Sequence, residues 1–588
     1  MKKKSVFCTV LVYLMVITFA ACSAKSDTPK KKTASKKTES IVDSGSAQTN
    51  VTSSMQEITT SSVVETTSYV TVSGKDDPNE PYGPQYAKEN VTYNNPDGKP
   101  LNLKVKSFGA KGDGVTDDAA AIYKAVSALC SAPKGSVLEF EKGKTYYYKD
   151  NAAPTNAVFY LKNNNCITIK GNGAIIKLGG TKNYYADISG CKDIAIEGLS
   201  FDYAEYKPAF MASAVRDVNL SEGSAVVTAD RDIHLENGES YPAGELYGAV
   251  ATEQSRHHMY LFKYEMLDSK KREVKIYFDK SNALTMSRLN NDYIYTYGFV
   301  LPMPFTGNKI ERGFSVSGNE NFTMKNVNIY SVPKHVFSLQ YNKGSFLFNN
   351  VKVVRAPYDK NLKYTSWADC YHLLHNRAKF KWIKCKNEWN FDDVFNISAV
   401  THNVTQVYSQ KEFRMVSATR ESTDSVIPGD TLCIINTKTG ALIGRTKVKS
   451  VIADDGKSVR VKMVEELPLL KAGENIYLWV DDTVAPGSEF VNCDFDGTFR
   501  ARSDLKFTNC RFVNKRFWIG LETISHEGPL GKNIIFKNCV FEGDNAWEVS
   551  SCNSNKNGYH LTNIVFEKCK NINKKIVGAS SIDEVIFR

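Results

Sequence analysis

The sequence predicts an all-β fold: a right-handed parallel β-helix with an N-terminal capping helix and two inserted antiparallel β modules. Three observations predict it. Short β-rich segments recur along the chain, several carry the same Asn-Cys-x-Phe pattern, and no long helical segment separates them. Strands that repeat in this way cannot bury their apolar face alone, but they can when they stack as successive coils of a solenoid.

The clearest copies of the repeat are Asn492-Cys493-Asp494-Phe495, Asn509-Cys510-Arg511-Phe512 and Asn538-Cys539-Val540-Phe541. Earlier segments, such as Cys191 to Ile196 and Phe322 to Val327, show the same alternation of apolar and polar positions. Alternation with a period of two predicts strands. We therefore expect Cys and Phe to point into the core and Asn to occupy the bends.

The cysteines also fit a packing role. None of the 13 cysteines belongs to a Cys-x-x-Cys pair of the kind that binds zinc, and the number is odd. A buried free cysteine behaves as a small hydrophobic residue. We expect free thiols, with disulfides of an exported protein as the alternative. Seven cysteines stand in the repeated context: Cys166, Cys191, Cys385, Cys493, Cys510, Cys539 and Cys569.

Residues 1–22 have the pattern of an export signal. Three lysines after Met1 precede an apolar run from Val6 to Ala21, which is too short to span a bilayer comfortably. The segment ends Phe19-Ala20-Ala21-Cys22, which resembles the lipobox of bacterial lipoproteins. That resemblance implies lipidation of Cys22 and a lipid-anchored protein on the extracellular face of the bacterial cell membrane. The alternative is an ordinary secretory signal.

Residues 23–84 predict a disordered linker, because Ser, Thr and Lys dominate and almost no large apolar side chain is present. Residues 1–40 hold nine Lys against Asp27 and Glu39, and so they supply seven of the eleven net positive charges. The remaining domain, 85–588, is not notably basic and contains no recognisable nucleic-acid module. Nucleic acid is therefore not an expected partner.

The domain begins with a segment that predicts a helix. Phe108 to Asp118 leads into Ala119 to Leu129, where apolar residues recur at helical spacing, and Asp117 is a natural N-cap. This stretch looks like the opening of the pectate-lyase-like superfamily, whose first helix covers the open end of the β-helix. Asp113, Asp117 and Asp118 resemble a metal cluster, but turns and capping explain all three, and we predict no metal site there.

Two regions interrupt the repeats, at about 203–300 and 403–485. Both contain β-rich stretches joined by turn pairs, and we expect antiparallel hairpins in each. The turn pairs are Glu222-Gly223, Thr439-Gly440 and Asp455-Gly456.

Acidic residues mark the candidate site. Asp369 and Asp392 are separated by 392 − 369 = 23 residues, with the repeat-like strand Phe380 to Cys385 between them. In a solenoid with coils of roughly 20 to 30 residues, they lie on adjacent coils, whose strands stack about 4.8 Å apart. Asp393 can face the same groove only if the chain bends there. Carboxylates that share one groove are what glycoside hydrolysis requires.

The pattern of this region resembles glycoside hydrolase family 110, the inverting exo-acting α-galactosidases. The shared features are an acidic segment with a histidine (Asp369 to His372), Asp392-Asp393 followed by Asn396 one coil later, Pro428-Gly429-Asp430, Arg500-Ala501-Arg502 and Glu527-Gly528-Pro529. The chain differs from the family at Cys370, where the family has Gly, and at Ser398, where it tends to have His.

The resemblance implies a function and a set of residues. Asp369 would be the general acid, and Asp392 or Asp393 would activate the water, with inversion of configuration and no cofactor. The substrate would be a carbohydrate with terminal α-linked galactose or a related sugar. The residues implied to line the sugar pocket are His372, Asn396, Arg500 and Arg502.

Two other functions are compatible with the sequence. One is another β-helix carbohydrase, either a pectin-type hydrolase or a lyase that needs Ca²⁺ and a basic residue. The other is a surface glycan-binding protein without turnover. Trp367, Trp389 and Trp518 could stack on a sugar, but packing is the commoner role for tryptophan. For His375, His402 and His526 we expect a polar surface role, and the sequence leaves the oligomeric state open.

Overall fold

A computed structural model describes residues 98–588 in one compact unit, with short gaps. The gaps are 150–154, 181, 206, 243–246, 252–255, 291–298, 304–311, 360, 363, 418–424, 439–441, 455–457, 473–474, 514–516, 519–527, 530, 543–548, 551–561, 573–575 and 578–584. The predicted signal 1–22 with Cys22, the whole predicted linker 23–84 and residues 85–97 of the predicted domain lie outside the described residues. Within the described part, no helix is long and apolar enough to cross a membrane.

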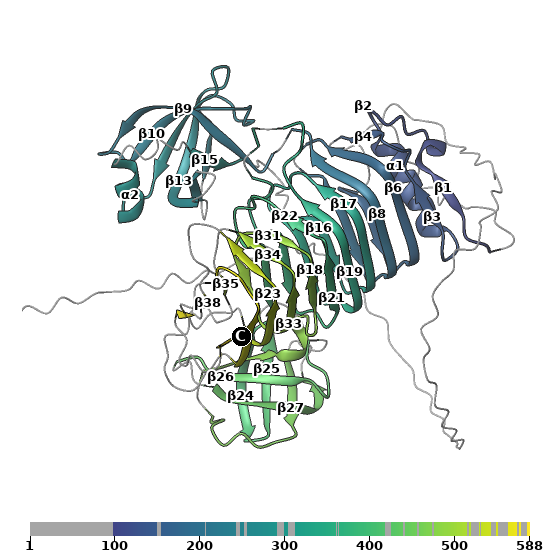
Figure 1. Cartoon of the computed structure of the whole chain (residues 1–588), viewed down its shortest axis with the longest axis vertical. Helices are drawn as coiled ribbons and strands as arrows, with labels where there is room; N and C mark the ends of the chain where they lie inside the picture. Colours follow the sequence, from purple (N-terminus) through teal and green to yellow (C-terminus); the bar gives the residue numbers. More distant parts are fainter. Residues whose placement is uncertain are drawn as a thin grey trace, which may run out of the picture. The chain divides into compact units, whose positions relative to one another are not determined.

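The structure confirms the predicted parallel β-helix (Figure 1). One parallel sheet has 18 strands: β1 (Asn102–Lys104), β2 (Asp113–Asp117), β3 (Val137–Glu139), β4 (Thr145–Tyr148), β6 (Asn165–Leu178), β8 (Lys192–Tyr203), β17 (Glu320–Ile329), β19 (Lys343–Val353), β21 (Lys379–Ile383), β22 (Lys386–Asn387), β30 (Glu489–Val491), β31 (Asp494–Asp496), β33 (Ser503–Thr508), β34 (Arg511–Val513), β36 (Lys532–Lys537), β37 (Val540–Glu542), β39 (Thr562–Glu567) and β41 (Val585–Phe587).

A second parallel sheet has ten strands and carries the candidate site. Its strands are β5 (Ala157–Lys162), β7 (Tyr184–Ser189), β16 (Arg312–Ser317), β18 (His335–Gln340), β20 (Tyr371–Leu374), β23 (Phe395–Ser398), β32 (Phe499–Arg500), β35 (Phe517–Trp518), β38 (Val549–Ser550) and β40 (Ile576–Val577).

The core consists of like side chains stacked from coil to coil. Phe490, Phe507, Phe536, Phe566 and Phe587 pair in register on successive strands of the 18-stranded sheet. Their ring centroids are separated in turn by 4.4, 4.7, 4.6 and 5.1 Å, and every pair is stacked. The Phe of the sequence repeat forms a second column beside this one: Phe495, Phe512 and Phe541 pair in register and are buried, as predicted.

The cysteines and asparagines of the repeat also have distinct places. All ten described cysteines are free, and Cys385, Cys493, Cys510 and Cys539 are buried. Cys166 differs, because it is only partly buried and its Sγ lies 3.9 Å from a carboxylate oxygen of Asp193. The prediction that it points inward was wrong. Asparagine turns the chain: Asn492, Asn509 and Asn538 have φ of 55°, 54° and 53°, a left-handed conformation that asparagine tolerates.

Helix α1 (Ala119–Ser131) contacts β1, β3 and β5 at the start of the solenoid, and the 3-10 helix η1 (Val105–Phe108) lies beside it. The predicted cap is shifted by one residue. Asp118 is the N-cap residue, while Asp117 Oδ1 accepts the amide hydrogen of Ala119 at 3.0 Å. The Asp118 carboxylate accepts the amides of Lys111 and Gly112. These aspartates therefore have the structural roles that we expected.

The first inserted module is a seven-stranded antiparallel sheet with a core of its own. Gly223, in the turn between β9 and β10, has φ of 73°. The elements are β9 (Ala209–Asn219), β10 (Ser224–Ala229), β11 (Ser240–Pro242), β12 (Tyr247–Ala251), β13 (Arg256–Asp268), β14 (Glu273–Phe278), α2 (Ala283–Asn290) and β15 (Phe299–Pro302).

The second inserted module is a closed six-stranded barrel with a separate core. Its first and last strands pair with each other, so the chain leaves and re-enters the solenoid at neighbouring points. The elements are β24 (His402–Ser409), β25 (Glu412–Ser417), β26 (Thr431–Asn436), β27 (Leu442–Ala453), β28 (Ser458–Met463) and β29 (Ile476–Val480), followed by the 3-10 helix η3 (Asp481–Thr483).

Candidate active site

Three consecutive coils place a polar side chain at the same point of the ten-stranded sheet. Phe337, Tyr371 and Phe395 pair in register on β18, β20 and β23, and their rings stack at 4.8 and 4.5 Å. Two residues before each ring stand His335, Asp369 and Asp393. The aromatic stack below fixes the register, and so these three residues lie one above another.

Asp369, Asp392 and Asp393 form one cluster, as the sequence predicted. One carboxylate oxygen from each residue lies within 4.8 Å of the other two. Asp369 and Asp393 are each 4% exposed, whereas Asp392 is exposed. The coil equivalent of Asp369 is Asp393, because the backbone amide of Cys370 donates to the carbonyl of Asp393 at 2.8 Å. Asp392 joins the cluster because it precedes β23, outside the regular strand.

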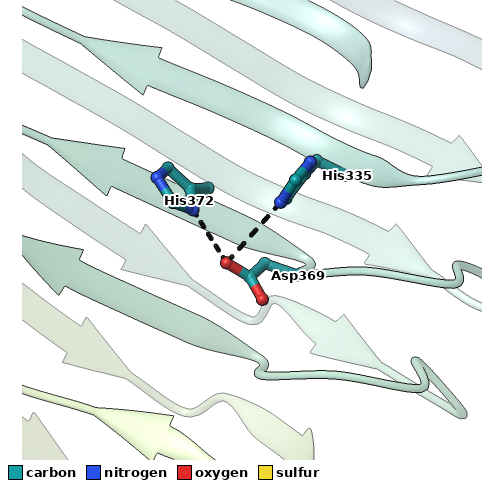
Figure 2. A group of neighbouring side chains, drawn as sticks. All are labelled: His335, Asp369 and His372. Carbon is teal, nitrogen blue, oxygen red and sulfur yellow. Dashed lines mark hydrogen bonds and ion pairs between the residues drawn. The ribbon is translucent and has the colours of Figure 1, made fainter. Parts of the chain in front are cut away.

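Two histidines flank Asp369 (Figure 2). His372 Nδ1 lies 2.8 Å from Asp369 Oδ2, and His335 Nε2 lies 3.9 Å from the same oxygen. Burial alone would raise the pKa of Asp369. The hydrogen bond from His372 and the positive charges of His335, His372 and Arg500 outweigh burial and lower that pKa below its usual value. Asp369 is therefore held in its ionised form at neutral pH.

A row of polar residues continues from His372 across the sheet. His372 pairs in register with Asn396, and Asn396 pairs with Arg500. The Arg500 guanidinium forms an ion pair with the carboxylate of Asp393. The structure thus brings together six of the seven residues that we expected in the site: Asp369, Asp392, Asp393, His372, Asn396 and Arg500.

Arg502, the seventh, is buried and lies outside strand β32. It is 1% exposed, and its Nη1 donates to the carbonyl of Ala501 at 3.3 Å. The resemblance placed both arginines of Arg500-Ala501-Arg502 in the sugar pocket. In the structure β32 ends at Arg500, and Arg502 lies beyond it among buried residues. The expectation that Arg502 lines the sugar pocket stays a prediction.

Trp367 and Trp389 are buried in an aromatic cluster behind the aspartates. The Trp367 ring stacks on Phe391, with ring centroids 4.1 Å apart. Tyr364 contacts the rings of Trp367, Trp389 and Phe391 edge to face. Ala209 and Val300 of the first inserted module belong to the same cluster. Packing is therefore the role of both tryptophans, and a sugar cannot stack on them. The Trp518 side chain lies outside the described part of the structure.

The expected surface role of two other histidines was wrong. His375 and His402 are both buried, and His375 Nε2 lies 2.8 Å from the carbonyl oxygen of Ser425. His526 lies outside the described residues.

His335 is the site residue that the sequence reasoning missed. It lies 369 − 335 = 34 residues before Asp369, whereas Asp393 follows after 393 − 369 = 24 residues. A search at one fixed coil length therefore passes over it. A usable signal was the aromatic residue two positions later in each coil, which aligns Phe337 with Tyr371 and Phe395 whatever the coil length.

The site also contains residues that could hold a metal ion. Within the described residues, two groups have suitable donor atoms within 4.8 Å of one another: His335, Asp369 and His372, and Asp369, Asp392 and Asp393. Asp369 belongs to both groups. The first group offers two imidazole nitrogens and one carboxylate oxygen, and the second offers oxygen only.

A comparison with protein families matches residues 102–361 to the family described as rhamnogalacturonase A/epimerase, pectate lyase-like. The match supports the expected pectate-lyase-like superfamily for the first coils. It ends 369 − 361 = 8 residues before Asp369, so it does not include the aspartate cluster. No curated protein matches the chain.

Similar solved structures include the family 28 exopolygalacturonase of Yersinia enterocolitica, with 12% identity, coverage of 80% of this chain and 66% of that one, and a TM-score of 0.34. The A-module of mannuronan C-5 epimerase AlgE6 of Azotobacter vinelandii has 10% identity, coverage of 83% and 99%, and a TM-score of 0.29. ORF18 of Geobacillus virus E2 has 11% identity and a TM-score of 0.29, and the match spans 80% of this chain but only 60% of that protein. At these values the likenesses carry no argument about activity.

Proposed function

We propose that this protein is a glycoside hydrolase that cleaves its substrate at the cluster of Asp369, Asp392 and Asp393. The observation that carries the proposal is the convergence of three carboxylates from two adjacent coils within 4.8 Å. Like charges brought this close are costly, and groups with such surroundings are concentrated at functional sites. The match of the first coils to a family named for rhamnogalacturonase and epimerase supports a carbohydrate substrate.

The three carboxylates have different surroundings, and we assign their roles accordingly. Asp369 is held ionised by His372 and His335, and Asp393 is paired with Arg500. Buried carboxylates held in this way suit the binding and activation of water, not the donation of a proton. Asp392 is the exposed member, and we assign it the role of proton donor. This assignment revises the expectation that Asp369 is the general acid.

We further propose inversion of configuration at a terminal α-linked galactose or a related sugar, as the resemblance in sequence implies. Acid and base of an inverting pair usually stand about 6.5–9.5 Å apart, farther than the oxygens of this cluster. In our assignment Asp369 and Asp393 hold the water on the face of the sugar opposite to the leaving oxygen, which Asp392 protonates. The short separation therefore requires the exposed Asp392 side chain to turn away from the other two when substrate binds. A direct attack by either carboxylate is disfavoured because both are buried and bound to cationic groups.

Sugar release from α- and β-linked galactosides and pectic oligosaccharides tests the proposal, with the anomer of the product followed by NMR. We expect β-galactose to appear first from α-linked donors. Retained configuration would contradict the water-activation roles. Unsaturated products would identify a lyase instead, and firm glycan binding without release would identify a binding protein.

Substrates with different leaving groups test the individual roles. The activity of an Asp392→Asn variant on natural glycans should fall by about 10²–10⁴-fold. Its activity on a dinitrophenyl glycoside, whose leaving group needs no protonation, should be largely kept. Asp369→Asn should be slow on both substrates. Asp187→Asn is a matched control, because Asp187 lies on the same sheet in the row of His372, three strands away. If Asp369→Asn instead keeps its activity on the dinitrophenyl glycoside and Asp392→Asn is slow on both substrates, Asp369 is the acid.

The sequence of residues 1–22 supports one further proposal, that the enzyme acts outside the cell while a lipid on Cys22 anchors it to the membrane. Metabolic labelling with a fatty acid should label the protein, and a Cys22→Ala variant should carry no label. Equal labelling of both proteins would contradict the anchor.

A further inference from the structure

We propose that His335, His372 and Asp369 bind a divalent transition-metal ion, and that the bound ion blocks the hydrolysis proposed above. The first statement depends only on the geometry of three side chains. The second rests on the proposed function, because it requires Asp369 to take part in the reaction.

The three donor atoms converge on one point (Figure 2). His372 Nδ1 and His335 Nε2 lie 2.8 and 3.9 Å from Asp369 Oδ2, and one possible ligand atom from each residue lies within 4.8 Å of the other two. Metal bonds of roughly 2.0–2.2 Å in a tetrahedral site place the ligand atoms about 3.4 Å apart. One contact must therefore open by about half an ångström and the other must close by as much, well within side-chain rotation.

The surroundings permit that adjustment on the histidine side and resist it on the aspartate side. The His335 and His372 side chains are 33% and 26% exposed, so their rings can turn and a metal ion can reach them. Asp369 is buried, and the stack of Phe337, Tyr371 and Phe395 fixes the coil on which it lies. The site thus combines one fixed ligand with two adjustable ligands.

The ligand types select the class of metal. Two imidazoles and one carboxylate suit Zn²⁺, Fe²⁺, Co²⁺ and similar ions, whereas Ca²⁺ and Mg²⁺ prefer sites made of oxygen alone. Charge also favours a cation here. Asp369 and Asp393 bring two negative charges together, and Arg500 supplies one positive charge to Asp393. A divalent ion at Asp369 offsets more of this repulsion.

Metal binding and water activation use the same carboxylate, that of Asp369. An ion bound to Asp369 Oδ2 takes the place of the His372 hydrogen bond and withdraws the carboxylate from the water that it would activate. We therefore expect Zn²⁺ to act as an inhibitor and a chelator to restore the activity.

Titration of the full-length chain with Zn²⁺ by calorimetry tests the binding site. We expect His335→Gln and His372→Gln each to weaken binding by about tenfold or more, and His234→Gln to leave it unchanged. His234 is the matched control, since it also lies beside an aspartate, with its Nδ1 3.7 Å from Asp232. Bound Co²⁺ should give an absorption spectrum without a thiolate charge-transfer band, which excludes the cysteines.

Equal Zn²⁺ affinity of both site variants and the wild type, or no binding up to millimolar Zn²⁺, would overturn the site. Circular dichroism shows whether each variant folds. Should a variant fail to fold, wild-type protein decides the question, because bound Zn²⁺ should protect His335 and His372 from diethyl pyrocarbonate; modification of both at an unchanged rate would refute the proposal.

The effect of bound Zn²⁺ on hydrolysis is measured in a separate experiment. Hydrolysis that continues unchanged when the site is loaded overturns the inhibitory role but not the binding. If the metal-free protein also hydrolyses no substrate, while Zn²⁺ binds as described, the proposed function is overturned and the metal site remains established.

Discussion

Asp369 illustrates at the scale of one residue how neighbours decide what a carboxylate can do. It is buried, which opposes ionisation, yet His372, His335 and Arg500 lower its pKa below the usual value. The lowered pKa stabilises the folded state above the unfolded pKa, and this contribution is lost as the pH falls through the folded pKa. An ionised Asp369 is also what water activation requires.

Removal of the imidazole of His372 should therefore change the pH dependence of catalysis. In a His372→Gln variant, the pKa of Asp369 rises, and the acidic limb of the profile of kcat/KM should move to higher pH. His234→Gln is the control. If the acidic limb does not move, the protonation of Asp369 does not set it, and the proposed role in water activation fails.

His402 gives a second prediction at this scale, concerning stability. It is fully buried, which lowers its pKa from 6.5 to about 3, and neither ring nitrogen has a hydrogen-bond partner among the described residues. Between pH 6.5 and pH 3, His402 binds a proton in the unfolded chain but not in the folded chain. The stability of the folded state therefore falls as the pH is lowered from 6.5 towards 3. The full loss is on the order of 4–5 kcal/mol.

A His402→Phe variant should lose this part of the pH dependence. Urea unfolding at pH 7 and at pH 4.5 measures it, and the difference in unfolding free energy between the two should shrink by roughly 2–3 kcal/mol in the variant. An unchanged difference would show that His402 is protonated in the folded state.

Individual site residues could be predicted from the sequence only where the number of residues in the coil that separates them was known. Asp369, Asp392 and Asp393 could be found from the sequence because one coil separates them. His335 could not be found in that way, because its coil is ten residues longer. The burial of Arg502 could not be predicted, because the sequence does not show that the short strand β32 ends at Arg500.

At the scale of elements, the aromatic cluster behind the site connects two bends that carry aspartates. Trp367 precedes Asp369 by two residues, Phe391 precedes Asp392 by one, and the two rings are stacked and buried. The packing of this one pair therefore helps to hold the two bends at a fixed separation.

Trp367→Ala should lower both stability and activity. The lost packing costs about 3–5 kcal/mol, and the resulting shift of Asp369 relative to Asp392 should reduce kcat by about 10²-fold with a smaller change in KM. Trp367→Phe keeps a ring to stack on Phe391 and should retain most of both properties. Thermal unfolding and steady-state kinetics measure the two effects. Full activity of a stably folded Trp367→Ala variant would contradict this role of the cluster.

The elements themselves were predicted with uneven success. The Asn-Cys-x-Phe repeat fixed strand, core face and bend together, because each of its residues has one preferred place in a coil. The capping helix was predicted too, but Asp117 and Asp118 are both good caps, and the sequence alone favoured the wrong one. Cys166 resembled the core cysteines in its context, yet it has a φ of 55° at the start of β6 and is only partly buried.

At the scale of the whole molecule, the described chain consists of a solenoid and two inserted modules with separate cores. The second module contacts the solenoid through specific polar pairs. Arg377, next to the coil of His372, forms an ion pair with Asp430 of the barrel module, with Nη2 at 2.8 Å from Oδ2, and His375 contacts Ser425. Cys433 of the barrel also packs with the solenoid core.

This organisation predicts that residues 401–482 fold without the solenoid. The barrel is closed and leaves no open sheet edge, and its first and last strands pair through His402 and Leu478. Five of its six strands supply buried residues to its core, and the sixth, β24, supplies the partly buried Val404 and Val407. A core of this size supplies only about 3–5 kcal/mol, so the isolated module should be marginally stable. Far-UV circular dichroism and urea unfolding should show a cooperative transition at low urea.

An Arg377→Gln substitution in the full chain should destabilise the barrel there by about 1–3 kcal/mol, since it leaves Asp430 buried without its guanidinium partner. Failure of the isolated module to unfold cooperatively would mean that the contacts of Asp430 and Cys433 with the solenoid are required for the barrel to form.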